Sequence, residues 1–334
     1  MAFLEKLRSE GVSCIYISHK LEEIYRICDR VTVIRDGQTI ATRDTADWTE
    51  SDLIENMIGR KVENMYYKTK RTFGEPVLEV SDLVVPHPTI KNRNIVDHVS
   101  FQLRKGEILG IGGLVGAGRS ETLEAIFGKT TEGVTKKVSI NGKPVEIHTP
   151  GDAIRAGLGF VTEERKLTGF IHTMDILENI SLPSLDDMPG GMMVDRKYEQ
   201  EEARRHYDRL RIKSPSMHQM VVNLSGGNQQ KVILAKWLMK NPEILFIDEP
   251  TKGIDVGTKS EFYKILDELA NEGMSIIMVS SDMPELVSVS DRVLVMCEGM
   301  VTGELEGEDI TQANVMKLAI SKNGRLVDQN WLSP

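Results

Sequence analysis

Short apolar runs recur along this chain between polar segments that contain glycine, a pattern typical of buried strands in an α/β protein. The clearest run covers residues 244–247 and ends at two adjacent carboxylates. Three more runs, at residues 77–80, 99–103 and 107–113, predict strands that lead into a glycine-rich segment. A charged stretch at residues 199–212 predicts a helix. Strands and helices that share one chain in this way indicate the α/β fold class.

The first forty residues carry a strand–helix–strand pattern of their own. An apolar strand is predicted to end at Ser18-His19, followed by a short helix, a second strand and a turn at Asp36-Gly37. The charged stretch at residues 1–11 is typical of an amphipathic helix and not of a signal peptide. A histidine at the end of a buried strand suggests a site, yet little precedes it that could build one.

This opening pattern returns 262 residues further along the chain. Residues 11–37 align with residues 273–299 without a gap, and 10 of the 27 positions are identical. The identities include charged residues, so common origin is favoured over the general likeness of any two strand–helix–strand units.

The repeat predicts how the chain is divided. If the second copy begins near Val77, the first copy lacks its N-terminal part, and the chain is N-terminally truncated relative to a tandem protein. We therefore expect a C-terminal fragment of a first domain at residues 1–60 and a linker at 61–76. A complete second domain is expected at 77–322, with a C-terminal tail at 323–334.

The glycine-rich segment at residues 113–120 has the strand–loop–helix context of a phosphate-binding loop. It fits G-x-x-x-x-G-K-[ST] except that Arg119 replaces the lysine. Backbone N–H groups would surround phosphate oxygens at the start of a helix, and the Ser120 hydroxyl would contact Mg²⁺. The predicted nucleotide-binding residues here are Gly113, Gly116, Ala117, Gly118, Arg119, Ser120 and Glu121.

A second anion site and a carboxylate pair follow later in the chain. Ser225, Gly226 and Gly227 precede a helix predicted to begin near Asn228, so their amides and hydroxyl could bind phosphate. Asp248 and Glu249 end a buried strand, where α/β sheets bind their ligands. Asp248 suits a water-mediated contact with Mg²⁺, and Glu249 suits orienting or deprotonating the attacking water.

These motifs, in this order, resemble the nucleotide-binding domain of ATP-binding cassette (ABC) transporters. Residues 113–120 look like Walker A, 224–229 the signature motif, 244–249 Walker B and 253–255 the D-loop. The strings LSGGNQQK and DEPTKGID, together with the repeat, resemble the tandem ATPase subunits of bacterial monosaccharide importers for ribose, galactose or xylose.

The resemblance implies a P-loop NTPase fold of the ABC type, with a mixed sheet, an antiparallel β subdomain and a helical subdomain near residues 165–222. It implies ATP and Mg²⁺ as cofactors, and ATP hydrolysis that energises carbohydrate import. The expected partners are membrane permease subunits and a sugar-binding protein, at the cytoplasmic face of the membrane. It also adds Gln229 and Asp255 to the nucleotide contacts.

In this family the histidine after the strand that follows Walker B reaches the γ-phosphate, and His19 occupies that position in the first copy. The second copy has Ser281 there, Arg119 for the Walker A lysine, and Glu163, or Glu164, where a glutamine is usual. Glu163 could still bind Mg²⁺, but each change alters phosphate positioning or charge. We expect this second site to be degenerate and to hydrolyse ATP slowly.

Cassettes of this family pair head to tail, so a complete first nucleotide-binding domain or a second copy of the chain would complete each ATP site. One alternative is a non-hydrolytic nucleotide-binding module that completes another chain's site. A less favoured alternative is a soluble tandem cassette protein that acts on the ribosome or DNA. The net charge of −9 argues against a nucleic-acid partner, and three scattered cysteines indicate neither disulfides nor zinc.

Overall fold

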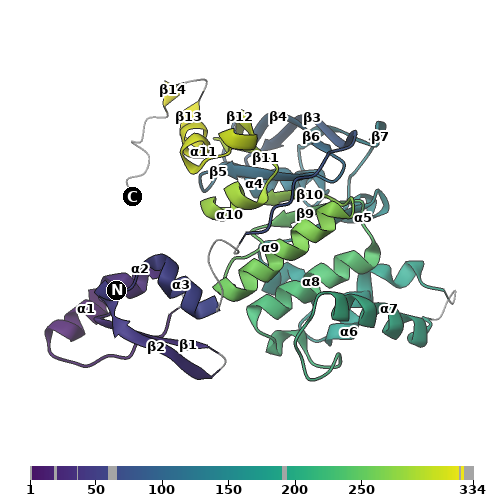
Figure 1. Ribbon diagram of the computed structural model, residues 1–334. Helices are drawn as coiled ribbons and strands as arrows, with labels where there is room; N and C mark the ends of the chain where they lie inside the picture. The colour runs from purple at the N-terminus through teal and green to yellow at the C-terminus, as the bar shows by residue number, and fades with distance from the viewer. Residues whose placement is uncertain are drawn as a thin grey trace.

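The computed structural model describes residues 2–18, 21–35, 37–58, 66–189, 194–322 and 325–326. Two separate hydrophobic cores are present among them, a small one in the first sixty residues and a large one from Val77 to Ala319. Figure 1 shows the first unit in purple and the second in blue to yellow.

The N-terminal unit is a β-hairpin covered by short helices, and its core includes Trp48 and Leu53. Residues 12–18 form no strand, so the predicted strand that ends at Ser18 is wrong. A strand needs a neighbour for its backbone groups, and this one has none among the described residues; the Ile15 side chain is 97% exposed. The elements are α1 (Ala2–Ser9), α2 (Leu21–Ile27), β1 (Arg30–Arg35), β2 (Gln38–Asp44) and α3 (Glu50–Ile58).

The second unit is built on a mixed sheet in the order β12-β11-β5-β10-β9-β8. All pairings are parallel except that of β12 with β11. Most of these strands are buried along their whole length, as expected for parallel strands covered on both faces. The strands are β5 (Ile108–Gly113), β8 (Leu158–Val161), β9 (Ile244–Asp248), β10 (Ser275–Val279), β11 (Arg292–Cys297) and β12 (Met300–Glu306).

A second, antiparallel sheet has the order β4-β3-β6-β7, which confirms the predicted antiparallel subdomain. The helices α6 and α7 lie within residues 165–222, where the helical subdomain was expected, and both pack against α8 (Figure 1). The strands are β3 (Pro76–Pro86), β4 (Asn94–Arg104), β6 (Thr135–Ile140) and β7 (Lys143–Val145). The helices are α4 (Arg119–Ile126), α5 (Pro150–Arg155), α6 (Ile176–Ser181), α7 (Arg196–Arg209), α8 (Gly226–Lys240), α9 (Val256–Asn271), α10 (Met283–Val289) and α11 (Gln312–Ala319).

The sequence repeat extends to the secondary structure at the same offset of 262 residues. The hairpin β1–β2 has its counterpart in β11–β12, and both hairpins carry a β-bulge at the equivalent position, Val33/Ile34 and Val295/Met296. In each copy the aligned serine and glutamate also make the same hydrogen bond, Ser18 to Glu23 and Ser280 to Glu285. The two copies therefore share a local structure in detail.

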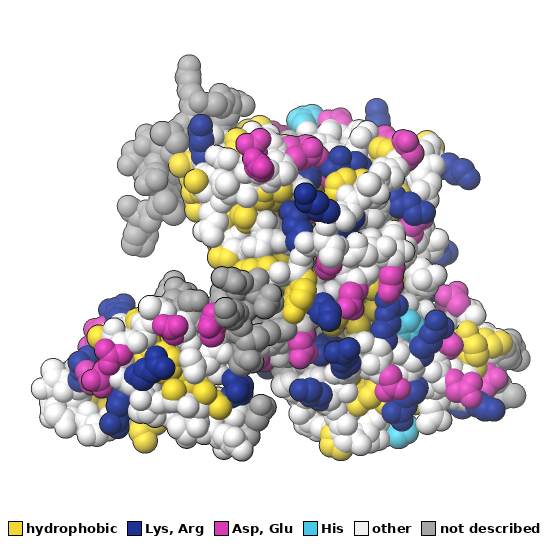
Figure 2. Space-filling view, viewed as in Figure 1, with side chains coloured by type: hydrophobic (Ala, Val, Ile, Leu, Met, Phe, Trp, Pro, Cys, Tyr) yellow, Lys and Arg dark blue, Asp and Glu magenta, His cyan; other side chains and the backbone are white. Residues whose placement is uncertain are grey.

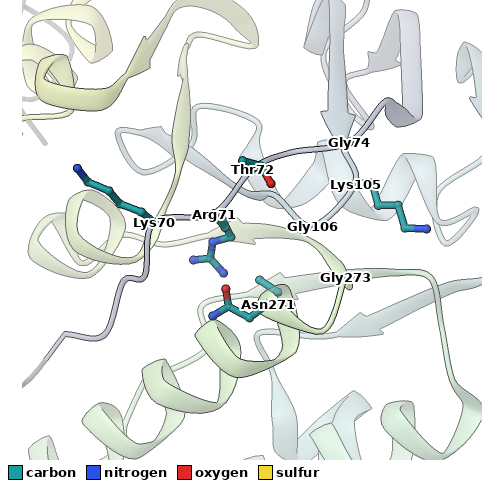
Figure 3. Close-up of a pocket in the computed structure, with 9 residues that line it drawn as sticks. Lys70, Arg71, Thr72, Gly74, Lys105, Gly106, Asn271 and Gly273 are labelled. Atoms are coloured by element: carbon teal, nitrogen blue, oxygen red, sulfur yellow. The ribbon is translucent and has the colours of Figure 1, made fainter.

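The segment at residues 66–74, which we call the strap, is packed onto the second unit although its sequence suggested a linker. Its Arg71 guanidinium lies between Asp267 (2.9 Å) and Asp291 (3.3 Å), and all three side chains are at most 7% exposed. Figure 3 shows Arg71 directed toward the end of α9 near Asn271. Tyr66 stacks on Tyr263 with ring centroids 5.2 Å apart. These contacts make the strap part of the second unit's fold.

The outer surface carries no strong segregation of charge on the face shown in Figure 2, where basic and acidic side chains are interspersed. Within the described ranges, no helix is long and apolar enough to cross a membrane.

Candidate functional site

The candidate residues meet at one edge of the six-stranded sheet. Strands β5, β10, β9 and β8 are adjacent and parallel, so their carboxyl ends lie side by side. The glycine-rich loop follows β5, Ser281 follows β10, Asp248 ends β9 with Glu249 directly after it, and Glu163 follows β8. The fold therefore gathers residues as far apart in the chain as Gly113 and Ser281, 168 positions.

The loop between β5 and α4 has the backbone that phosphate binding requires. Gly116 (φ 80°) and Gly118 (φ 91°) adopt left-handed conformations that are unfavourable for residues with a side chain. Gly118 is the N-cap of α4, and Ser120 and Glu121 lie in that helix's first turn. The first N–H groups of a helix have no partner within it, so they are available to an anion.

Arg119, at the position of the usual lysine, is buried and already engaged. Its Nη1 donates to the Ser280 carbonyl (2.7 Å), and its Nη2 lies 3.9 Å from Glu249 Oε1. Its guanidinium therefore lies against the end of β10 and the carboxylate that we predicted to act on water.

Glu249 is held in a defined orientation. The Ser281 hydroxyl donates to Glu249 Oε2 (2.9 Å), and the Glu249 backbone has a positive φ of 48°. Burial raises the pKa of Glu249 above its usual range. Ser281 occupies the position aligned with His19, and in this structure its hydroxyl orients Glu249. His19 itself lies outside the described residues.

Asp248 and Ser120 form an arrangement that fits a hard divalent cation. The Ser120 side chain is close enough to the Asp248 carboxylate to lower its pKa, while Asp248 Oδ1 is buried without a hydrogen-bond partner. Burial raises the pKa of Asp248 to about 7, and the Glu163 and Glu249 charges act in the same direction. An unpartnered carboxylate oxygen beside a hydroxyl is a donor set that Mg²⁺ accepts, usually with phosphate oxygens completing its shell. Ser120 and Asp248 would hold the ion.

Glu163 makes a contact that the sequence did not suggest. Its Oε1 lies 2.5 Å from Lys252 Nζ, and Glu164 lies 3.8 Å from the same nitrogen. Lys252 follows the carboxylate pair by three residues. The Glu163 side chain is therefore neutralised by the loop that precedes α9, and as a metal ligand it stays a prediction.

The remaining predicted residues lie around the start of α8 and α9. Ser225 Oγ accepts from the Asn228 side chain (3.0 Å), and Asp255 caps α9 by accepting from the Thr258 N–H (3.0 Å). Gln229 is 3% exposed and donates to the Leu224 carbonyl (3.1 Å), so it stabilises the loop before α8. Gly226 and Gly227 open α8.

Comparison with known proteins agrees with this geometry. Residues 96–252 match a family model described as ABC transporter. A dimeric ATP-binding cassette in a post-hydrolysis state, bound to ADP and Pi, aligns over 69% of this chain and 98% of its own length, with a TM-score of 0.61 and 22% identity. A nucleotide-free cassette aligns over 74% of this chain with a TM-score of 0.63 and 21% identity. The chain has the ATP-binding cassette fold of the P-loop NTPases.

More similar relatives are ATP-binding proteins named for sugar import. The xylose import protein XylG of Thermoanaerobacter pseudethanolicus is 44% identical over 316 residues, and the ribose import protein RbsA of Clostridium tetani is 44% identical over 319. The galactose/methyl galactoside import protein MglA 1 of Photobacterium profundum is 43% identical over 320. Each alignment covers 95% of this chain but only 62–63% of the relative. The chain is thus similar to ATP-binding proteins of sugar import and spans about three fifths of their length.

Proposed function

We propose that this chain is the ATP-binding subunit, or the C-terminal part of one, of an importer for a monosaccharide. Residues 77–322 would form a nucleotide-binding domain that binds ATP with Mg²⁺, and residues 1–60 would be the end of a preceding one. The observation that carries the proposal is the meeting of the phosphate loop, Asp248 and Glu249 at one sheet edge. The identity of about 44% to import ATP-binding proteins for xylose, ribose and galactose supports the transport role.

We expect the proposed site to hydrolyse ATP slowly. Phosphoryl transfer depends on positioning and on cations that neutralise charge developing in the transition state. Here the Arg119 guanidinium lies against the Ser280 carbonyl and Glu249, and Ser281 offers a short neutral hydroxyl that contacts Glu249. When bound, Mg²⁺ would supply charge neutralisation to the phosphate oxygens. We infer strong nucleotide binding with weak hydrolysis.

Partners follow from the surfaces that remain exposed. The π-helical turn η3 (Arg165–Gly169) follows the site loop and presents Leu167, 79% exposed, with Ile171 nearby at 39%. An apolar surface beside the helical subdomain suits a membrane permease at the cytoplasmic face, supplied with sugar by a binding protein. Ser225 and Asp255 make hydrogen bonds to residues close to them in the chain. They would contact an ATP held by the phosphate loop of a first nucleotide-binding domain or of a second copy of the chain.

Equilibrium binding of ATP in the presence of Mg²⁺ tests this proposal. The full chain should bind ATP, and Ser120→Ala should bind it about tenfold more weakly or worse, because the hydroxyl beside Asp248 is lost. Ser81→Ala, which removes an exposed hydroxyl of β3, is the matched control. Absence of ATP binding by the folded wild-type chain would overturn the proposal.

A second function is favoured by one observation, the proximity of Arg119 to Glu249. If that contact persists with nucleotide bound, the chain is a non-hydrolytic module that supplies its signature residues to another chain's ATP. Turnover in a mixture with a complete cassette, absent from the chain alone, would support this second function.

A further inference from the structure

Arg165 joins three segments of the second unit that the sequence places far apart. Its Nη1 donates to the Lys252 carbonyl (2.6 Å) and its Nη2 to the Gly253 carbonyl (3.3 Å). A Cβ on Gly226 would lie 2.8 Å from Arg165 Nη2, so the start of α8 packs directly on the guanidinium. One side chain after β8 thereby touches the loop before α9 and the first turn of α8.

Lys252 makes the return contact. Its backbone carbonyl accepts from Arg165, while its ammonium reaches back to Glu163, two residues before Arg165. Each of the two loops therefore places a cation on the other, a reciprocal arrangement that constrains both their separation and their orientation.

We propose that Arg165 and Lys252 form a latch that makes three segments move as one body: residues 162–165, residues 250–255 and the start of α8. Arg165 is a positioning residue in this arrangement. It sets where Asp255 and Ser225 lie, the two groups proposed above to reach a nucleotide bound to another domain. This functional meaning rests on the proposed function, whereas the mechanical coupling does not.

The latch depends more on Arg165 than on the ion pair alone. The Lys252 and Glu163 side chains are 56% and 33% exposed, and such pairs contribute only about 0–1 kcal/mol. Arg165 is half-buried, and its charged hydrogen bonds go to two carbonyls of a tight turn in which Gly253 has a φ of 66°. Charge-assisted bonds of this kind are stronger than neutral ones.

The latch also connects the exposed surface of η3 with the loop before α9. Leu167 and Arg165 belong to the same π-helical turn. A partner that displaces Leu167 would therefore move Arg165, and Arg165 would move the Lys252 and Gly253 carbonyls with it. The Glu163 position would follow through its contact with Lys252.

Hydrogen exchange of the full chain tests the coupling. The amides of Ile254 and Thr258, each hydrogen-bonded within the 250–258 region, report its opening. Arg165→Gln should accelerate their exchange about tenfold, the effect of losing about 1.4 kcal/mol, while amides inside β9 keep their rates. Lys166→Gln, at an exposed neighbouring cation, should change nothing.

Substitutions that restore the contacts of Arg165 and Lys252 distinguish a positioning role of these residues from a general loss of stability. Arg165→Lys keeps the charge but cannot reach both carbonyls, so it should give an intermediate rate. Glu163→Lys and Lys252→Glu should each accelerate hydrogen exchange of the Ile254 and Thr258 amides. The two substitutions together exchange the charges and should return the exchange rate to that of the wild-type chain. An unchanged rate in Arg165→Gln, or equal acceleration in β9, would overturn the latch.

A binding measurement keeps this inference distinct from the proposed function. Because Arg165 does not belong to the phosphate loop, Arg165→Gln should bind a fluorescent ATP analogue within about twofold of wild type. Loss of analogue binding in Arg165→Gln alone would count against a purely positional role. Failure of the wild-type chain to bind the analogue would refute the proposed function and leave the exchange result intact.

Discussion

Replacing Arg71 by alanine tests whether the strap is part of the second unit's structure. The change removes the guanidinium that lies between Asp267 and Asp291, whose side chains are 7% and 5% exposed. Breaking a buried ion pair by removing one partner costs about 3–5 kcal/mol, because the other charge is left without compensation. We expect the free energy of unfolding to fall by about that amount, a large part of a domain's total stability.

Urea unfolding monitored by circular dichroism at pH 5 and pH 8 provides the assay. Burial already raises the pKa of Asp291 while Arg71 opposes the rise, so without Arg71 the pKa should be higher still. A raised carboxyl pKa costs stability as pH increases, so the loss in Arg71→Ala should be smaller at pH 5 than at pH 8. Arg155→Ala removes a side chain that is 74% exposed and serves as the control.

A loss of less than about 1 kcal/mol in Arg71→Ala at pH 8, a value typical of surface pairs, would show that the strap does not stabilise the second unit through Arg71. Arg71→Ala combined with Asp291→Asn should recover part of the loss, since it removes one of the two carboxylate charges that lose the Arg71 guanidinium. If the double variant is less stable than the single one, the carboxylate charge is not the cause.

Two further substitutions test the second unit. Burial raises the pKa of Glu285 from 4.5 to about 7. Between these two pH values the folded state binds a proton that the unfolded state has lost, so the free energy of unfolding should fall as pH rises from 4.5 to about 7. Glu285→Gln should abolish this dependence and gain roughly 3 kcal/mol over wild type at pH 8; an identical pH profile would contradict it. Gly227→Ala places a Cβ 2.2 Å from Thr258 Cγ2, so we expect a loss of about 1–3 kcal/mol in urea unfolding, relieved by adding Thr258→Ser. No relief would show that the clash lies elsewhere.

The parts of the fold that could be predicted are those with a strong local pattern. Strand β9 is an apolar run that ends in carboxylates, and the loop before α4 has a spacing of glycines that few other structures need. Both follow from residues adjacent in the chain, so pattern alone located them.

Other features depend on contacts between distant residues and could not be predicted. The strap is polar in sequence, so nothing in its own residues predicts that it is buried. Its burial depends on the contacts of Arg71 with Asp267 and Asp291, which lie far along the chain. Glu163 and Lys252 are 89 positions apart. Residues 12–18 show the opposite error, because a strand-like pattern forms no strand without a neighbouring strand.

The rate of phosphate release from ATP by the purified chain, measured beside that of Glu249→Gln, shows whether the site hydrolyses ATP slowly. With Arg119 against Glu249 and a serine at position 281, we expect ATP to be bound but phosphate release to stay near that of the Glu249→Gln variant. Release far above the variant's rate would contradict a degenerate site, because it would show that Arg119 and Ser281 support hydrolysis.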